Sequence, residues 1–290
     1  MSVNKLCSKL IIGTANFNQK YGIANNFKSI SKKEIKKIIK LAYLNKIYTF
    51  DTSPDYGNAE KNLGKYSSKN FNFISKLNKI STKNLNQSIE SSIIESLKKL
   101  NKKKLEGLLL HDEKVLLKKR GLNIFNVLKK LKKKGLFKMI GVSFYNKNIL
   151  LKTIKKFNLD FVQIPVNIFD QRFIDKDLIN KLKEKKIKIY ARSIFLQGIL
   201  LKTNTKTKKK FLKWDIEFKK YHNFLKENNL TPLEACLNFV LDKKFIDKIL
   251  IEILNKKELL QILNCTNVTG IDYKIMKQNK KIKLINPSYW

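Results

Sequence analysis

Short apolar segments alternate with lysine-rich stretches along the whole chain. The apolar segments are each four to six residues long, and most are rich in Ile, Val, Leu, Phe or Tyr. Segments of this length and composition, bounded by polar residues, predict β-strands. The predicted strands are Leu10–Gly13, Tyr48–Asp51, Phe71–Lys76, Leu108–His111, Met139–Ser143, Phe161–Pro165, Ile187–Arg192 and Ile249–Ile253.

The stretches between these strands repeat apolar residues at helical spacing. Two of the apolar faces are Ile35, Ile38, Ile39 and Ala42, and Ile89, Ile93, Ile94, Leu97 and Leu100. Ser31 precedes the first of these stretches and Glu34 follows it by three residues, a spacing typical of a capping box at a helix N-terminus. The chain is therefore predicted to alternate strands with helices.

This alternation, with short connections, requires parallel strands joined by right-handed crossovers. Eight such units in a chain of 290 residues are typical of a closed (β/α)8 TIM barrel. The main alternative, an open doubly wound sheet, usually carries the glycine-rich loop G-x-G-x-x-G after its first strand. Here residues 13–18 read Gly-Thr-Ala-Asn-Phe-Asn instead. We therefore expect one barrel domain over residues 1–290.

The chain is strongly basic, with 62 Lys+Arg against 23 Asp+Glu and a formal net charge of +39. Such an excess suggests a polyanionic partner such as nucleic acid. However, the only arginines are Arg120, Arg172 and Arg192, and nucleic-acid readers rely on arginine for bidentate contacts. The lysines are also spread over nearly every predicted helix. We interpret them as solvated helix surfaces and expect no specific nucleic-acid partner.

Cysteine content and hydropathy indicate the setting in which the protein works. Cys7, Cys236 and Cys265 are far apart and form no CxxC pair or metal-binding spacing, which favours a reducing, cytoplasmic location. The apolar run near the N-terminus is too short for a signal peptide, and no segment has the ~18 apolar residues of a membrane span. We therefore expect a soluble protein with no membrane insertion and no metal site.

One predicted connection is long and polar. Residues 202–210 read KTNTKTKKK and follow the seventh strand, with Phe211 and Trp214 after them. Two interpretations remain open for this segment. It is either a surface loop without a role or a mobile flap over a bound ligand, because long loops at this face of barrels often gate the site.

Three consecutive predicted strands end in ionisable residues. Asp51, Lys76 and His111 end the second, third and fourth strands, and Tyr56 lies in the loop after the second. Barrel enzymes draw catalytic groups from the carboxyl ends of their strands, so these side chains are predicted to meet at one rim. Each has a purely structural explanation when taken alone, as a surface lysine, a helix cap or a packed aromatic. His111 is one of only two histidines, and the other, His222, lies in a lysine-rich amphipathic stretch. The joint placement of Asp51, Tyr56, Lys76 and His111 at one rim favours catalysis.

At these residues the chain resembles the aldo-keto reductase superfamily. The resemblance covers about residues 10–265 and is carried by Asp51–Gly64 (DTSPDYGNAEKNLG), Ile74–Lys76, Leu109–His111, Ile140–Ser143, Gln163–Asn167 and Ala191–Gly198. The first three resemble segments that carry the catalytic residues of that family, and the last three resemble its cofactor-binding strands. The resemblance implies a barrel that transfers hydride between NADPH and an aldehyde or ketone.

The resemblance also implies a role for each catalytic residue. Tyr56 would act as the general acid that protonates the carbonyl oxygen. An unperturbed tyrosine has a pKa near ~10, which suits neutral pH poorly, and the ammonium of Lys76 is expected to lower that pKa. Asp51 would keep Lys76 charged and oriented. His111 would donate a hydrogen bond to the carbonyl oxygen and position the substrate.

Further matching positions suggest a cofactor site. The residues expected to bind the cofactor are Ser143, Gln163, Arg192, Ser193, Phe195, Leu196, Gly198 and Lys256. The first two match residues that hydrogen-bond the nicotinamide carboxamide. The segment 193–198 matches the loop along the pyrophosphate, and Lys256 begins a helix expected near the adenosine phosphate of NADPH.

Two positions depart from the family pattern. Glu252 stands where the family usually has a glycine after the last strand. A carboxylate there repels a cofactor phosphate, and the missing glycine removes close backbone access to it. The Ser-Asn pair often seen in the fifth strand is Ser143-Phe144 here.

Two functions therefore stay open. The first is a carbonyl reductase, and Gly13–Phe17 with Tyr21–Asn25 resemble bacterial members found with surface-sugar biosynthesis genes, which suggests a sugar-type carbonyl substrate. The second is a protein of the same fold that binds or regulates a partner, as ion-channel auxiliary subunits do; Glu252 motivates this alternative. The complete set of four catalytic residues favours the first. No sequence pattern specifies an oligomeric state.

Overall fold

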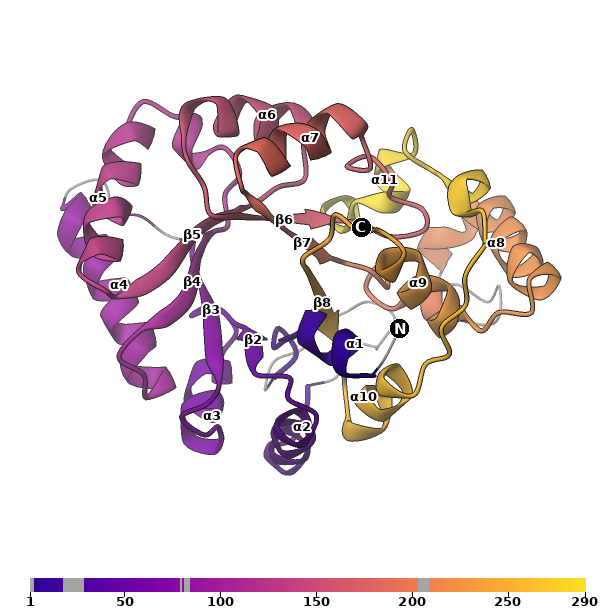
Figure 1. Ribbon diagram of the computed structural model, residues 1–290, viewed down its shortest axis with the longest axis horizontal. Helices are drawn as coiled ribbons and strands as arrows, with labels where there is room; N and C mark the ends of the chain where they lie inside the picture. The colour runs from indigo at the N-terminus through magenta and orange to yellow at the C-terminus, as the bar shows by residue number, and fades with distance from the viewer. Residues whose placement is uncertain (1–2, 18–28, 79, 81–83, 203–208) are drawn as a thin grey trace.

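The computed structural model describes residues 3–17, 29–78, 80, 84–202 and 209–290. Within these ranges, eight parallel strands close into a barrel in the order β1 to β8, so that every strand pairs with its neighbours in sequence and β8 pairs with β1. Figure 1 looks down the barrel and shows the helices arranged around the ring of strands. The predicted (β/α)8 barrel is confirmed.

The strands lie close to their predicted positions. They are β1 (Leu10–Gly13), β2 (Thr49–Asp51), β3 (Asn72–Leu77), β4 (Leu105–Leu110), β5 (Phe137–Ser143), β6 (Phe161–Pro165), β7 (Lys188–Arg192) and β8 (Lys248–Glu252). The largest difference is in β4, which begins three residues before the predicted Leu108 and ends before His111.

One helix, α1, precedes β1, and the other helices follow the strands. Those described are α1 (Val3–Lys9), α2 (Lys32–Leu44), α3 (Ala59–Tyr66), α4 (Leu85–Leu100), α5 (Gly121–Lys133), α6 (Lys147–Lys156), α7 (Lys176–Glu184), α8 (Asp215–Glu227), α9 (Pro232–Leu241), α10 (Lys256–Leu263) and α11 (Ile282–Ile285). The predicted apolar face of α2 is buried. On α4, Ile94 is 51% exposed and does not belong to the buried face, so that part of the prediction is wrong. Ile93 takes the buried position, and the next residue on a helix points about 100° away.

Two predicted features fall outside the described residues. One is Tyr21–Asn25, part of the resemblance to the sugar-associated branch. The other is positions 203–208 of the polar connection considered as a loop or flap. Among the described residues, no helix is both long and apolar enough to cross a membrane.

The barrel interior is filled by a separate apolar layer. It consists of Ile11, Ile74, Leu109, Phe161, Tyr190 and Leu250, with Met139 packed against it. The rings of Phe161 and Tyr190 lie 4.9 Å apart between centres. Gly107 and Gly141 face Phe161 and leave room for its ring. This layer closes the barrel below the carboxyl ends of the strands.

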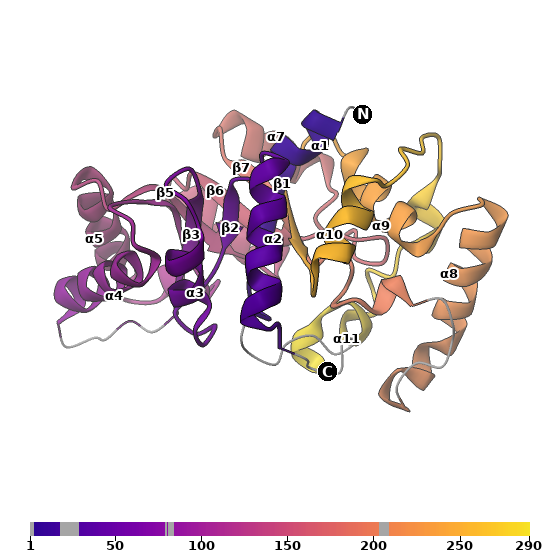
Figure 2. The ribbon, with the colours of Figure 1, turned by 90° about the horizontal axis from the view of Figure 1, so that it is seen from below.

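The two ends of the barrel differ in what covers them. Figure 2 shows α1 at one end and α11, with the C-terminus, at the other, toward which the strands run. Because all strands are parallel, the last residue of every strand reaches that same end. Residues that end strands are therefore neighbours there despite their separation in sequence.

We predict that Gly141→Ala destabilises the barrel by about 1–3 kcal/mol, because a Cβ at this position overlaps the Phe161 ring and the interior cannot expand freely. The free energy of unfolding from urea titration is the measurement. Gly107→Ala is the matched control, since its Cβ would lie 3.1 Å from Phe161 Cε1 and needs a smaller adjustment. An equal or larger loss for Gly107→Ala would contradict this packing.

Candidate active site

Each strand places one inward position at the carboxyl end of the barrel. Side chains alternate along a strand, so the residue two positions beyond an interior residue also points inward, and residues paired across parallel strands share a face. Gly13 pairs with both Asp51 and Glu252, and Ser143 pairs with Gln163. The inward positions in strand order, called the rim ring below, are Gly13, Asp51, Lys76, His111, Ser143, Gln163, Arg192 and Glu252.

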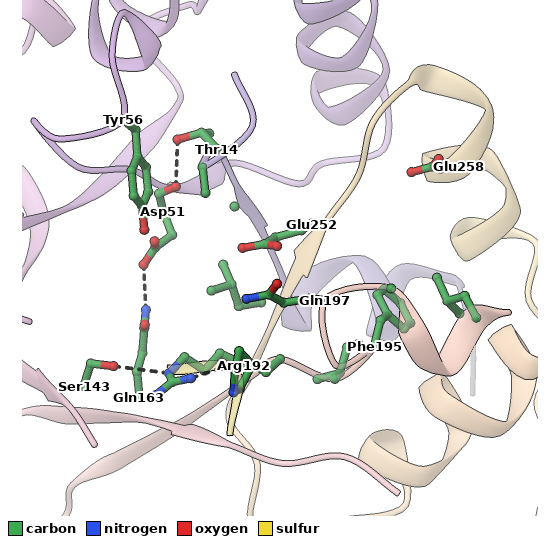
Figure 3. Close-up of a pocket in the computed structure, with 18 of the residues that line it drawn as sticks. Thr14, Asp51, Tyr56, Ser143, Gln163, Arg192, Phe195, Gln197, Glu252 and Glu258 are labelled. Atoms are coloured by element: carbon green, nitrogen blue, oxygen red, sulfur yellow. Dashed lines mark hydrogen bonds between the residues drawn. The ribbon is translucent and has the colours of Figure 1, made fainter. Parts of the chain in front are cut away.

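The rim ring forms the floor of a cavity of about 320 Å³, and all eight of its residues line that cavity. The walls come from loops at the same end, including Tyr56, Tyr145 and the segment after β7. The cavity continues outward to Glu258 and Gln261 on α10. Figure 3 shows the side chains of Asp51, Gln163 and Glu252 converging from different strands. Three of the four predicted catalytic residues thus belong to the ring, and the fourth, Tyr56, lies directly above it.

A buried ion pair holds the ring together. The Lys76 ammonium donates hydrogen bonds to Asp51 Oδ1 and, at 3.0 Å, to the Thr52 carbonyl oxygen. Asp51 Oδ2 accepts a further hydrogen bond of 2.6 Å from Gln163 Nε2. The side chains of Lys76 and Asp51 are only 5% and 3% exposed. Burial lowers the pKa of Lys76, but the attraction of Asp51 and of Tyr56 outweighs it, and the net pKa lies above its ordinary value.

Tyr56 reaches this pair from a tight turn after β2. The Tyr56 N–H donates to the Ser53 carbonyl at 3.0 Å, and Gly57 follows with a φ of 56°, a left-handed conformation that glycine adopts without strain. Lys76 Nζ lies 4.8 Å from the centre of the Tyr56 ring. The structure thus brings the phenol into contact with the ammonium.

The pKa of Tyr56 is nevertheless raised. Burial raises it, Lys76 lowers it, and the carboxyl groups of Asp51 and Glu252 raise it again. Lys76 thus acts on the Tyr56 pKa in the expected direction, but burial and the two carboxyl groups outweigh it, and the net pKa lies above the ordinary value. The physical reason is that Asp51 already neutralises the ammonium, so little net positive charge remains to offset the loss of solvent around the phenol.

His111 directly follows the last residue of β4, lines the cavity and is exposed to solvent. Burial by the surrounding atoms lowers the pKa of its imidazole, and the positive charges of Lys76 and Arg192 lower it further. The imidazole is therefore neutral at neutral pH and retains one N–H donor.

Arg192 binds the residues expected to hold a nicotinamide. Its Nε donates to Ser143 Oγ at 3.2 Å, and its other nitrogens donate to the Phe144 carbonyl at 3.1 Å and to Ser193 Oγ at 3.3 Å. The guanidinium stacks on the Tyr145 ring at 3.9 Å, a contact that the sequence pattern did not predict. The only available signal for Tyr145 was its place two residues beyond the end of β5. The guanidinium is thereby fixed in the cavity wall.

The segment after β7 has an unusual backbone. Ser193, Leu196, Gln197 and Gly198 all have positive φ, at 55°, 47°, 53° and 82°. Such conformations cost non-glycine residues about 1–3 kcal/mol and concentrate at functional sites. Ser193, Phe195 and Gly198 line the cavity as expected for cofactor-binding positions, whereas the Leu196 side chain is fully buried in the core. Gln197 also lines the cavity and was not predicted.

Glu252 occupies the eighth place in the rim ring. Its side chain leans over Gly13, where a Cβ would lie 3.1 Å from Glu252 Cγ. Figure 3 shows the carboxyl group extending from β8 into the cavity toward Asp51. Burial raises the pKa of Glu252 to about 7, repulsion from Asp51 adds to this shift, and Lys76 and Arg192 partly oppose it.

Lys256 begins α10 outside the cavity. Its backbone N–H donates at 2.7 Å to Glu34 Oε1 from α2. The predicted capping box is therefore only half formed: Ser31 Oγ accepts from the Glu34 N–H at 3.3 Å, but the Glu34 carboxylate binds α10 and Lys37 instead. Sequence spacing identified the cap and could not reveal this contact between helices.

A second carboxylate lies at the same helix start. Glu258 Oε2 accepts a hydrogen bond of 2.7 Å from the Leu254 N–H, and the Asn255 side chain accepts one of 2.9 Å from the Glu258 N–H. Helix N-termini attract anions, and at α10 the carboxylates of Glu34 and Glu258 already accept hydrogen bonds from backbone N–H groups. The outer end of the cavity is consequently lined by acidic and amide groups.

Comparison with known proteins agrees with the fold. The family model described as "Aldo/keto reductase family" matches residues 9–283. The solved structure of a glycerol dehydrogenase from Gluconobacter oxydans is 18% identical, with 96% of this chain and 92% of that chain covered and a TM-score of 0.70. An aldo-keto reductase from Bacillus halodurans, in its holo form, is 15% identical over 97% and 93% of the two chains, with a TM-score of 0.69. No curated protein matches the chain.

We predict that the losses of unfolding free energy caused by removing Lys76 or Asp51 alone are not additive, because each single change leaves one buried charge without its partner. Lys76→Met and Asp51→Asn should each lower the free energy of unfolding by about 3–5 kcal/mol, because an unpaired charge stays buried. The double variant should lose clearly less than the sum of the two. Urea unfolding of the four proteins provides the cycle, and simple additivity would contradict a direct interaction.

The raised pKa of Glu252 predicts a pH-dependent stability. The carboxyl group ionises near pH 4.5 when unfolded and at about 7 when folded, so the folded state binds the proton more tightly. Its ionisation should therefore reduce stability as the pH rises between these values. Relative to Glu252→Gln, the wild type should lose roughly 1–3 kcal/mol of unfolding free energy from pH 5 to pH 8. Parallel stability curves for the two proteins would exclude the shift.

Proposed function

The chain belongs to the aldo/keto reductase family, and we propose that it reduces an aldehyde or ketone by hydride transfer from a nicotinamide dinucleotide, with Tyr56 as the general acid. The observation that carries this proposal is the contact between the Tyr56 phenol and the Lys76 ammonium, which Asp51 holds in place beside His111. This arrangement provides a proton donor and a carbonyl-binding N–H in one cavity, and carbonyl reduction requires both groups.

The raised pKa of Tyr56 suits the proposed role. At neutral pH the phenol is protonated, so it has a proton to give to the carbonyl oxygen. As the proton leaves, the phenolate that forms lies beside the Lys76 ammonium, and their attraction stabilises it. Asp51 and the Thr52 carbonyl fix the ammonium in the position where this attraction is available. His111 is neutral and donates its N–H to the carbonyl oxygen, which orients the substrate toward Tyr56.

The inner part of the cavity fits a nicotinamide. A carboxamide needs hydrogen-bond donors and acceptors together, and Ser143, Gln163 and Arg192 supply both at the cavity floor. When bound, the nicotinamide would supply or accept the hydride. The segment 193–198, with Gly198 at its end, lies between this floor and α10 and supports the proposal that a dinucleotide extends in that direction.

The finer proposal for the cofactor is NADPH. Its support is the pair of exposed lysines, Lys256 and Lys257, that begins α10. The Lys256 N–H contributes nothing to a phosphate site, because it already donates to Glu34. Dissociation constants for NADPH and NADH, measured by fluorescence titration, decide between the two cofactors. Tighter binding of NADH would refute NADPH as the preferred cofactor.

The substrate class proposed is a sugar-type carbonyl. The cavity lining is partly polar and includes Gln197, Glu252 and His111, and side chains of this kind bind hydroxyl substituents. Screening aldehydes, keto-sugars and nucleotide sugars for oxidation of NADPH or NADH tests both the activity and the class. Reduction of apolar aldehydes alone would refute the sugar-type substrate.

A binding or regulatory role without turnover is the second candidate, and Glu252 in the cavity is the observation that favours it. The two candidates differ in what they predict for the cofactor. No binding of either dinucleotide at ~100 µM would favour the second candidate, because reductases work with micromolar to millimolar constants.

We predict that Tyr56→Phe lowers kcat by about 100-fold or more, since positioned general acids contribute roughly 10²–10⁴-fold. Its dissociation constant for the cofactor should change by less than about threefold, because the ring remains. Tyr43→Phe, at a tyrosine that is 42% exposed, is the control and should behave as the wild type. Near-normal turnover in Tyr56→Phe would refute the assigned acid.

A further inference from the structure

Glu252 is the member of the rim ring whose charge has no partner. The strand register places it level with Asp51, separated only by Gly13 of β1, which has no side chain to come between them. Within the described part of the chain, no side chain or backbone group donates a hydrogen bond to the Glu252 carboxyl group. Asp51, by contrast, accepts from Lys76 and Gln163. The carboxyl groups of Asp51 and Glu252 therefore lie on either side of Gly13, and only the charge of Asp51 is neutralised by a direct partner, Lys76.

The cations near Glu252 are engaged elsewhere. Lys76 on β3 binds Asp51 and the Thr52 carbonyl. Arg192 on β7 binds Ser143, Ser193 and the Phe144 carbonyl. Their charges act on Glu252 across the cavity, together with the opposing charge of Asp51 on β2, and Glu252 in turn acts on Tyr56 in the loop after β2.

The cavity leads any extended ligand past Glu252. Its inner end lies at Tyr56, Lys76 and His111, and its outer end lies at Glu258 and Gln261 on α10. Glu252, at the end of β8, lies between the labelled Tyr56 and Glu258 in Figure 3, near Gln197. A dinucleotide with its nicotinamide at the inner end would carry its pyrophosphate past Glu252. Glu258 adds a second carboxylate near the outer end, so two carboxylates oppose the positive charge of Lys202, the further lysine in the cavity lining.

We propose that Glu252 couples cofactor binding to proton uptake: the cavity accepts the dinucleotide when the Glu252 carboxyl group is protonated and binds it weakly when the carboxylate has formed. The inference rests on the proposed function, because it concerns the same cofactor. Glu252 is then a specificity-determining residue, because its ionisation state sets the affinity of the cavity for the negatively charged pyrophosphate. The protonated carboxyl group is also a hydrogen-bond donor, so it changes from a repelling neighbour of a phosphate into a bonding one.

The direction of the pH dependence follows from the ionisation of Glu252. Its pKa of about 7 in the free protein means that both forms are present near neutral pH. An adjacent pyrophosphate disfavours the carboxylate and raises this pKa further. Binding therefore draws a proton from solution, and affinity falls as the pH rises above 7, approaching tenfold per pH unit until the pKa of the complex is reached.

The test is the binding of NADH, which lacks the additional titrating phosphate of NADPH. Fluorescence titration from pH 6.5 to pH 8.5 gives the dissociation constant, and calorimetry in two buffers of different ionisation enthalpy gives the number of protons taken up. The wild type should bind about tenfold or more weakly at pH 8.5 than at pH 6.5, with proton uptake at pH 7.5. Glu252→Gln should vary by less than about threefold, take up no proton and bind more tightly than the wild type at pH 8.5.

A strand glutamate at the opposite end of the barrel provides the matched control. Glu106 on β4 pairs with Lys138 and does not line the cavity, so Glu106→Gln should keep the wild-type pH dependence and proton uptake. The inference is overturned if Glu252→Gln retains the wild-type slope, or if the wild type binds NADH equally well throughout. Binding that is strong but independent of pH overturns this inference alone. If NADH does not bind, the titration is repeated with NADPH, and absence of binding of both dinucleotides in all three folded proteins overturns the proposed function as well.

Discussion

The closed parallel register of the barrel is the constraint on which the site depends. It forces eight strands from distant parts of the chain to end at one rim and fixes which residue of each points inward. Ile11, Ile74 and Leu109 fill the interior, and the residues two positions further along each strand become neighbours in the cavity. A shift of one residue in any strand would turn its ring member out of the cavity, and a shift in β3 or β6 would break a contact of Asp51.

Burial in the rim ring explains both the strength and the sensitivity of its electrostatics. Charges in a poorly solvated ring act on each other strongly, so Lys76 and Asp51 must pair, and an uncompensated group such as Glu252 shifts its ionisation toward neutral pH. The same burial keeps the Tyr56 phenol protonated. The ammonium beside it acts mainly on the phenolate that forms during reaction. The rim ring thus keeps the Tyr56 phenol protonated before the reaction and stabilises the phenolate that the reaction forms.

Much of this arrangement could be predicted from the sequence because it follows from periodicity. The strands have clear apolar patterns, and residues that end parallel strands must meet, so the amino-acid order alone identifies Asp51, Lys76 and His111. Contacts between separate helices leave no such pattern. Nothing local to Glu34 indicates that its carboxylate reaches the start of α10, and nothing local to Tyr145 indicates that it stacks on Arg192. The net pKa of Tyr56 could not be predicted from the sequence either, because it depends on burial and on the distances to several charges, which the sequence does not contain.

The central claim is that the Lys76 ammonium stabilises the Tyr56 phenolate. Its most direct test is an NMR titration of protein labelled with ¹³C at tyrosine Cζ, with Tyr56 assigned through Tyr56→Phe. In the wild type the pKa of Tyr56 should lie above the ordinary ~10, and in Lys76→Met it should rise further, because burial then acts without the opposing ammonium. A pKa that is unchanged or lower in Lys76→Met would contradict the claim.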